Sequence, residues 1–213
     1  MDFLPAPSVM VAFTFACILL ALTPGPDMTY FLSRTLAGGR KMGIMAMLGA
    51  TTGLMGHALL AGFGLSALIA ASTRAFMVIK VVGAVYLLFL AVQAIRHGSA
   101  LSIARTQGEG PGAFATWLTG IGVNLTNPKV ILFYVTFLPQ FVDVHDPAAS
   151  HKLLFMALYF LFVGTLINGL VIMVASRFIL MMRENPKAMR IFDYGFAALM
   201  SAFALRIITV QGQ

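Results

Sequence analysis

The sequence predicts an all-α integral membrane protein with six transmembrane helices. We expect these helices to form two inverted three-helix repeats, with helices 1 and 4 broken at proline motifs. Of the 213 residues, 60% are hydrophobic and only 10% are charged, whereas a soluble domain carries about 25% charged residues. The net charge of +7 does not indicate nucleic-acid binding, because the basic residues are scattered between apolar runs.

The apolar runs take up almost the whole chain and leave no room for a water-soluble domain. A membrane-spanning helix needs about 20 apolar residues. We therefore predict one transmembrane domain over residues 1–213, with a first repeat at about 9–96, a connection at about 97–113 and a second repeat at about 114–209. The six runs lie at about 9–33, 43–71, 76–96, 114–138, 152–181 and 191–209.

The basic residues between the runs predict the orientation. The first, third and fifth connecting segments hold nine lysines and arginines, and the opposite side holds four. Cytoplasmic loops carry an excess of these residues, so we expect those three segments in the cytoplasm and both termini outside. The nine are Arg34, Arg40, Lys41, Arg96, Arg105, Arg177, Arg183, Lys187 and Arg190, and the four are Arg74, Lys80, Lys152 and Arg206.

The beginning of the chain does not have the pattern of a cleaved signal peptide. Met1-Asp2-Phe3 contains no basic residue, and no small-x-small cleavage site follows the apolar run before Pro24 and Pro26. We expect the first apolar run to be retained as a helix.

The first apolar run is interrupted by Thr23, Pro24, Gly25, Pro26 and Asp27. Proline lacks a backbone donor and clashes with the preceding turn, so the helix must kink or break here. Asp27 then lies at membrane depth, where a charge is costly and usually functional. Transporters build substrate sites from such broken helices near the middle of the membrane.

The fourth run contains a second interruption, Asn124-Leu125-Thr126-Asn127-Pro128-Lys129. Setting Pro26 against Pro128 pairs Asp27 with Lys129, which carries the opposite charge. The two motifs therefore occupy matching places in the two halves of the chain. We predict that the site lies where the two broken helices meet.

The second and fifth runs also correspond. Gly53 and His57 are four residues apart in one, and Gly164 and Asn168 are four residues apart in the other. Each half holds an odd number of predicted helices, so the second half has the opposite orientation in the membrane to the first. This arrangement is an inverted-topology repeat.

The charges of the two motifs suit an amino acid, which is a zwitterion. Lys129 offers a cation for a carboxylate and Asp27 an anion for an ammonium group; alternatively, the two neutralise each other as a buried ion pair. Asp27 and His57 are the two candidates for carrying a proton. Asn124, Asn127 and Asn168 either bind substrate or satisfy backbone groups that the breaks leave free.

Other functions find little support in the sequence. Cys17 is the single cysteine, which excludes an internal disulfide and a cysteine-based metal cluster, and we expect no cofactor. The motifs of intramembrane proteases are absent, so we predict that the chain is not an enzyme. An exporter of another small solute or cation, and a passive channel, remain the alternatives. The sequence leaves the oligomeric state open, including a homo-oligomer.

Together the motifs resemble the LysE/RhtB family of amino-acid exporters. The resemblance rests on Thr23-Pro24-Gly25-Pro26-Asp27, the glycine-spaced second run, and Asn124 to Lys129 followed by Phe133 and Leu138-Pro139-Gln140-Phe141. It covers essentially the whole chain. It implies an inner-membrane exporter of amino acids or derivatives such as homoserine, its lactone or threonine, driven by the proton gradient. The motifs do not identify the substrate.

Overall fold

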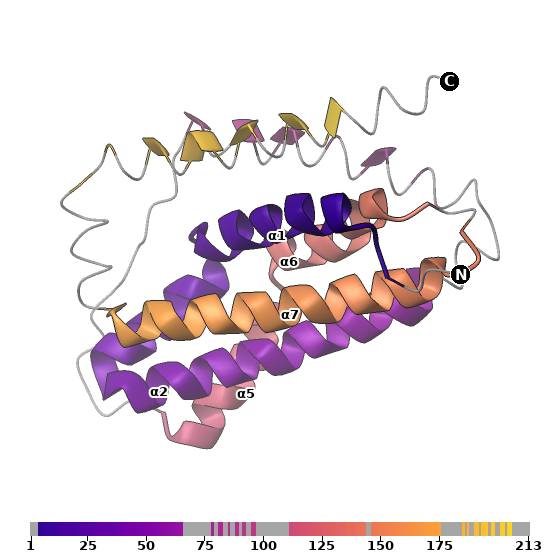
Figure 1. The fold of residues 1–213 in the computed structure, drawn as a ribbon. Coiled ribbons are helices and arrows are strands. Elements are labelled where there is room, and N and C mark those ends of the chain that lie inside the picture. Colours follow the sequence, from indigo (N-terminus) through magenta and orange to yellow (C-terminus); the bar gives the residue numbers. More distant parts are fainter. Residues whose placement is uncertain are drawn as a thin grey trace.

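The computed structural model describes residues 4–65, 111–143 and 146–175, together with isolated helical positions between 78 and 96 and between 185 and 205. All regular structure in this part of the chain is helical (Figure 1). The α-helices are α1 (Pro7–Leu22), α2 (Pro26–Leu59), α5 (Ala113–Leu125), α6 (Pro128–Leu132) and α7 (Ala149–Met173). Three short segments continue these helices: the π-helical η1 (Leu60–Leu65) after α2, and the π-helical η2 (Phe133–Phe137) and 3₁₀-helical η3 (Leu138–Phe141) after α6.

By length and composition, two of the described helices qualify to cross a membrane, namely Pro26–Gly64, which includes a change of direction at Gly39, and Ala149–Met173. The pair Ala113–Leu125 and Pro128–Phe141, bent by 50° at its break, forms a third span if the two parts are counted together. Helix α1 is apolar but shorter. The third and sixth predicted helices fall largely outside the described residues, so the six-helix repeat remains a prediction.

The first helix ends at Leu22, and α2 begins at Pro26. Pro26 fits the first position of α2 because an N–H there would have no partner within the helix. Helix α2 then changes direction at Gly39, whose φ of 75° and ψ of 178° are not helical. Only glycine adopts this backbone conformation without strain. The chain turns back here, so the second part of α2 runs beside α7 (Figure 1).

The turn at Gly39 lies within the connection that the sequence predicted between the first two runs, but one of the cations assigned to that connection is buried in a helix. Arg34, counted there as a loop cation, lies within α2 and is 8% exposed. Its Nη2 donates a hydrogen bond of 3.2 Å to the Pro111 carbonyl, just before α5. A buried guanidinium needs such acceptors, so Arg34 ties two helices together instead of facing the solvent.

The second break separates α5 from α6. The Asn127 side chain accepts a hydrogen bond of 3.0 Å from the backbone N–H of Lys129, and Pro128 occupies the first turn. This is an N-cap, in which a side-chain oxygen satisfies a donor that the new helix leaves free. The asparagine and proline of the motif therefore start a helix that points in a new direction.

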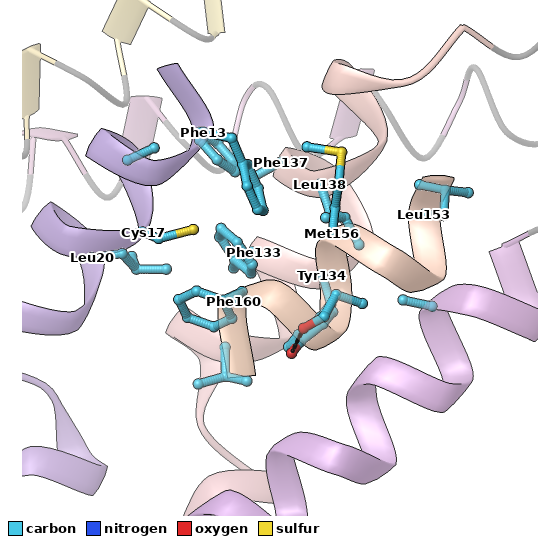
Figure 2. Close-up of a cluster of buried hydrophobic side chains, with 14 of the residues drawn as sticks. Phe13, Cys17, Leu20, Phe133, Tyr134, Phe137, Leu138, Leu153, Met156 and Phe160 are labelled. Carbon is cyan, nitrogen blue, oxygen red and sulfur yellow. Dashed lines mark hydrogen bonds between the residues drawn. The ribbon is translucent and has the colours of Figure 1, made fainter. Parts of the chain in front are cut away.

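An aromatic cluster packs α1 against η2, η3 and α7 (Figure 2). Phe133 lies at its centre. The centroid of its ring is 4.0 Å from the ring centroid of Phe160 and 6.1 Å from that of Phe13. Close packing of this kind makes the cluster a rigid support for both broken helices. The labelled members in Figure 2 are Phe13, Cys17, Leu20, Phe133, Tyr134, Phe137, Leu138, Leu153, Met156 and Phe160.

Helices α2 and α5 make the most extensive contact between described elements. A Cβ added at Gly49 would lie 2.0 Å from the Trp117 carbonyl oxygen, and one at Gly120 would lie 2.4 Å from the Ala46 carbonyl oxygen. Small residues let helix backbones approach closely in membranes. Gly49 and Gly120 therefore allow the backbones of α2 and α5 to come into contact where the two helices cross.

Candidate functional site

Asp27 lies in the first turn of α2, directly after the first break. Its Oδ1 accepts a hydrogen bond of 3.0 Å from the backbone N–H of Met28. The start of a helix carries a partial positive charge, which stabilises a carboxylate there. The break therefore makes it less costly to hold an acidic group inside the protein.

Lys129 lies in the first turn of α6 and reaches the end of α1. Its Nζ donates hydrogen bonds of 2.9 Å to the Thr23 carbonyl and 3.3 Å to the Leu20 carbonyl. The last carbonyls of a helix lack partners and carry a partial negative charge. Lys129 thus caps the end of α1 from the other half of the chain.

The two charges are close to each other but not in tight contact. The distance from Lys129 Nζ to Asp27 Oδ1 is 3.9 Å, and the side chains are 14% and 12% exposed. Each charge therefore has a helix end as a partner in addition to the other charge. This geometry is compatible with both interpretations of the pair, as a substrate site and as a structural ion pair.

Gly25 provides the space in which the two charges meet. A Cβ added at Gly25 would lie 3.0 Å from Lys129 Nζ and 3.3 Å from Asp27 Oδ1. The Gly25 backbone is extended, with φ of −153°, so the requirement for glycine comes from space and not from backbone strain.

A cavity of about 30 Å³ lies beside the charged pair. It has room for about two water molecules, so binding an amino acid requires the walls to move apart. Four of the predicted residues line it: Asp27, Lys129, Asn124 and Asn168. The other lining residues are Leu20, Ala21, Met28, Phe31, Met47, Ala50, Thr51, Leu54, Val130, Phe160, Gly164 and Thr165.

Two amide oxygens on this wall have no partner among the described residues, namely Oδ1 of Asn124 and Oδ1 of Asn168. Both atoms are buried. A buried polar atom without a hydrogen bond is costly, which is a common feature of binding sites. The wall can therefore accept hydrogen bonds from a ligand.

His57 and Asn127 are not among the residues that line the cavity. The His57 ring stacks against that of Tyr134, with 5.9 Å between the centroids, and lies beside the backbone of Asn124. Asn127 is 1% exposed and caps α6. In this geometry Asn127 positions Lys129, and His57 contacts the aromatic cluster.

Two residues of the cavity wall with polar side chains, Thr51 and Thr165, were not singled out from the sequence. Thr51 and Thr165 face each other from α2 and α7, with 3.2 Å between their hydroxyl oxygens. Thr165 precedes Asn168 by three residues, which places both on one face of a helix. That spacing was the available signal, but threonines are too common in helices for it to stand out.

A second hollow of about 480 Å³ lies between the Gly39 turn and the end of α7. Among the described residues, its walls include Thr35, Arg40 and Ile172. Thr35 follows Phe31 by one helical turn, and Ile172 follows Asn168 by one turn. The buried Phe31 and Ile172 belong to an apolar cluster between the two hollows.

The profile of the LysE type translocator family matches residues 18–211, which includes both proline motifs. The chain belongs to the LysE family. The family is one of translocators and not of enzymes, and this LysE protein is accordingly a membrane protein. The resemblance seen in the motifs is thereby confirmed.

Relatives of this LysE protein occur in several bacteria. A homoserine/homoserine lactone efflux protein of Salmonella typhimurium is 30% identical over 195 residues, covering 88% of this chain and 90% of the relative. An uncharacterized membrane protein of Vibrio cholerae is 35% identical over 150 residues, covering 70% and 71%. An uncharacterized membrane protein of Bacillus subtilis is 31% identical over 174 residues, covering 75% of this chain and 83% of the relative. No solved structure matches this chain.

Proposed function

We propose that this protein exports amino acids or close derivatives across the cytoplasmic membrane in exchange for protons. The observation that carries the proposal is the cavity whose wall holds Asp27 and Lys129, each at the end of a half-helix. A zwitterion needs a partner for each charge in a low-dielectric layer. Homoserine, homoserine lactone and threonine are the first candidates, since homologous proteins of Salmonella are named for efflux of the first two.

Asp27 supplies a mechanism for the exchange. Its carboxylate can bind a proton or the ammonium group of a substrate, but not both at once. A site with this property couples the outward movement of substrate to the inward movement of protons. Of the two candidate proton carriers, Asp27 is the one that lines the cavity, and we therefore assign the proton to it.

The second hollow is the proposed route from the cytoplasm to the site. In the orientation predicted from the basic residues, the Gly39 turn and the end of α7 face the cytoplasm. The hollow of about 480 Å³ falls within the usual size of ligand pockets. The apolar cluster around Phe31 and Ile172 separates it from the central cavity, so this layer must open for a substrate to pass.

The proposal is tested in everted membrane vesicles that contain the protein. Labelled homoserine, homoserine lactone, threonine and other amino acids are offered with a proton gradient, and accumulation is measured with and without an uncoupler. We expect accumulation of at least one of them, with loss on uncoupling. Accumulation of none would refute amino-acid export. Flux that only equilibrates and ignores the uncoupler would indicate a passive channel.

A further inference from the structure

Most of the described threonines use their hydroxyl within their own helix. Seven of them donate to the carbonyl four residues earlier, as helical threonines often do. Thr51 and Thr165 make no such bond to the described chain; instead, their hydroxyls meet across the cavity. The seven are Thr14, Thr23, Thr35, Thr52, Thr119, Thr126 and Thr136.

This pair leaves hydrogen-bonding capacity unused on the cavity wall. Each hydroxyl has one proton to donate and two positions to accept. One proton is shared between Thr51 and Thr165, and the other has no partner among the described residues. Oδ1 of Asn168, one turn from Thr165, is also buried without a partner there. The wall therefore offers both a donor and an acceptor for another hydroxyl group.

We propose that Thr51, Thr165 and Asn168 form a subsite that recognises a hydroxyl group on the substrate side chain. The inference rests on the proposed function, in which Asp27 and Lys129 hold the two charged ends of an amino acid. A substrate hydroxyl beside the two threonines accepts a hydrogen bond from one of them and donates a hydrogen bond to Oδ1 of Asn168. The preferred substrates are hydroxylated amino acids.

The rest of the wall makes this recognition selective. It is mainly apolar, with Met47, Leu54 and Phe160 among its members, so water cannot readily replace a missing partner. A site built to bind a hydroxyl rejects the analogue without it, because its own polar groups then stay unpaired. The wild type should therefore transport homoserine and threonine in preference to 2-aminobutyrate, which is the deoxy analogue of both.

The test compares labelled homoserine with labelled 2-aminobutyrate in everted vesicles at equal amounts of inserted protein. Thr51→Val and Thr165→Val keep the shape of the side chain and remove the hydroxyl. We expect the wild type to favour homoserine in kcat/KM by about tenfold, which is the order of the effect of leaving a buried hydrogen-bonding group without its partner. Each valine variant should lower this preference by about tenfold, mainly through a higher KM for homoserine.

Two controls separate recognition from damage to the fold. Thr165→Ser retains a hydroxyl and should retain the preference. Thr52→Val removes the neighbouring hydroxyl of α2, which bonds to the Leu48 carbonyl and to Trp117 Nε1 away from the cavity, and should leave the preference unchanged.

The outcomes distinguish this inference from the proposed function. A wild type that transports both compounds equally, or valine variants that keep the wild-type preference, would overturn the hydroxyl subsite while leaving amino-acid export intact. If a valine variant does not insert in the membrane, the test still rests on two measurements. These are the preference of the wild type for homoserine over 2-aminobutyrate and the preference of the Thr165→Ser variant. Failure of the wild type to transport any amino acid would instead refute the proposed function itself.

Discussion

Asp27 and Lys129 each combine a side-chain charge with a helix end of opposite partial charge. Asp27 accepts from the N–H of Met28 at the start of α2, and Lys129 donates to the Thr23 carbonyl at the end of α1. Isolated charges would be expensive at this depth. The helix breaks therefore provide local partners for both groups beside the cavity.

We predict that Asp27→Asn abolishes proton-driven efflux while the protein still inserts in the membrane. The amide keeps the shape of the side chain but cannot take up a proton. Uptake of labelled substrate into everted vesicles measures the loss, and the amount of inserted protein on a blot provides the control. Normal proton-coupled transport by this variant would remove Asp27 from the mechanism.

Gly25→Ala should reduce transport. The new methyl group would lie 3.0 Å from Lys129 Nζ and 3.3 Å from Asp27 Oδ1, so these side chains must shift by a few tenths of an ångström and the geometry of the charged pair changes. The matched control is Gly112→Ala, another glycine that precedes a helix but has open space around its Cβ position. If both alanine variants transport equally well, the spacing at Gly25 is not important.

At the scale of the helix, the crossing of α2 and α5 depends on residues without side chains. Gly49→Ala places a methyl group 2.0 Å from the backbone oxygen of Trp117, and a backbone cannot rotate away as a side chain can. We expect a loss of about 1–3 kcal/mol in the free energy of unfolding, typical of overpacking. Thermal unfolding in detergent measures it.

The control for this prediction is Gly122→Ala in α5, where nothing lies within 4 Å of the added Cβ. Alanine favours the helix over glycine by up to about 1 kcal/mol, so this variant should be as stable as the wild type or slightly more so. Equal destabilisation of both variants would contradict the close crossing.

The start of α7 is held by Asp146, which lies outside the membrane-spanning segments. Its carboxylate accepts hydrogen bonds from Lys152 Nζ and from the backbone N–H of Ala148. The bond from Lys152, followed by that from Ala148, lowers the pKa of Asp146 below its usual value. The carboxylate therefore stabilises the folded state above about pH 4, and this contribution is lost as the pH falls through the lowered pKa.

We predict that the melting temperature of the wild type falls in acid more steeply than that of Asp146→Asn. Lys152→Met should flatten the acid limb in the same way, because it removes the main cause of the lowered pKa. Melting curves in detergent between neutral pH and about pH 3 provide the measurement. Parallel curves for all three proteins would show that the contact does not contribute to stability.

For the molecule as a whole, the orientation in the membrane decides which hollow faces the cytoplasm. Arg40→Cys and Ser150→Cys introduce thiols at exposed positions near opposite ends of the described bundle. The native Cys17 is fully buried and should not react. In right-side-out vesicles, an impermeant maleimide should label the cysteine introduced at position 150, whereas that at position 40 should react only after permeabilisation. The reverse pattern would invert the proposed orientation.

Composition and proline chemistry alone determined the helical membrane class and the two motifs around Pro26 and Pro128. Both follow from local physics, because apolar length predicts a span and proline interrupts a helix. The LysE family could likewise be recognised from these motifs. The third and sixth helices and the inverted repeat remain predictions from the sequence.

The tertiary structure decided which polar residues share the cavity. Asn168 lines it and His57 does not, although the two occupy corresponding places in the predicted repeats. Likewise, Lys129 reaches the carbonyls of α1 and Thr51 meets Thr165 only because distant helices cross at particular angles. Helical periodicity specifies which face of one helix a residue occupies, but the packing of several helices determines what that face meets.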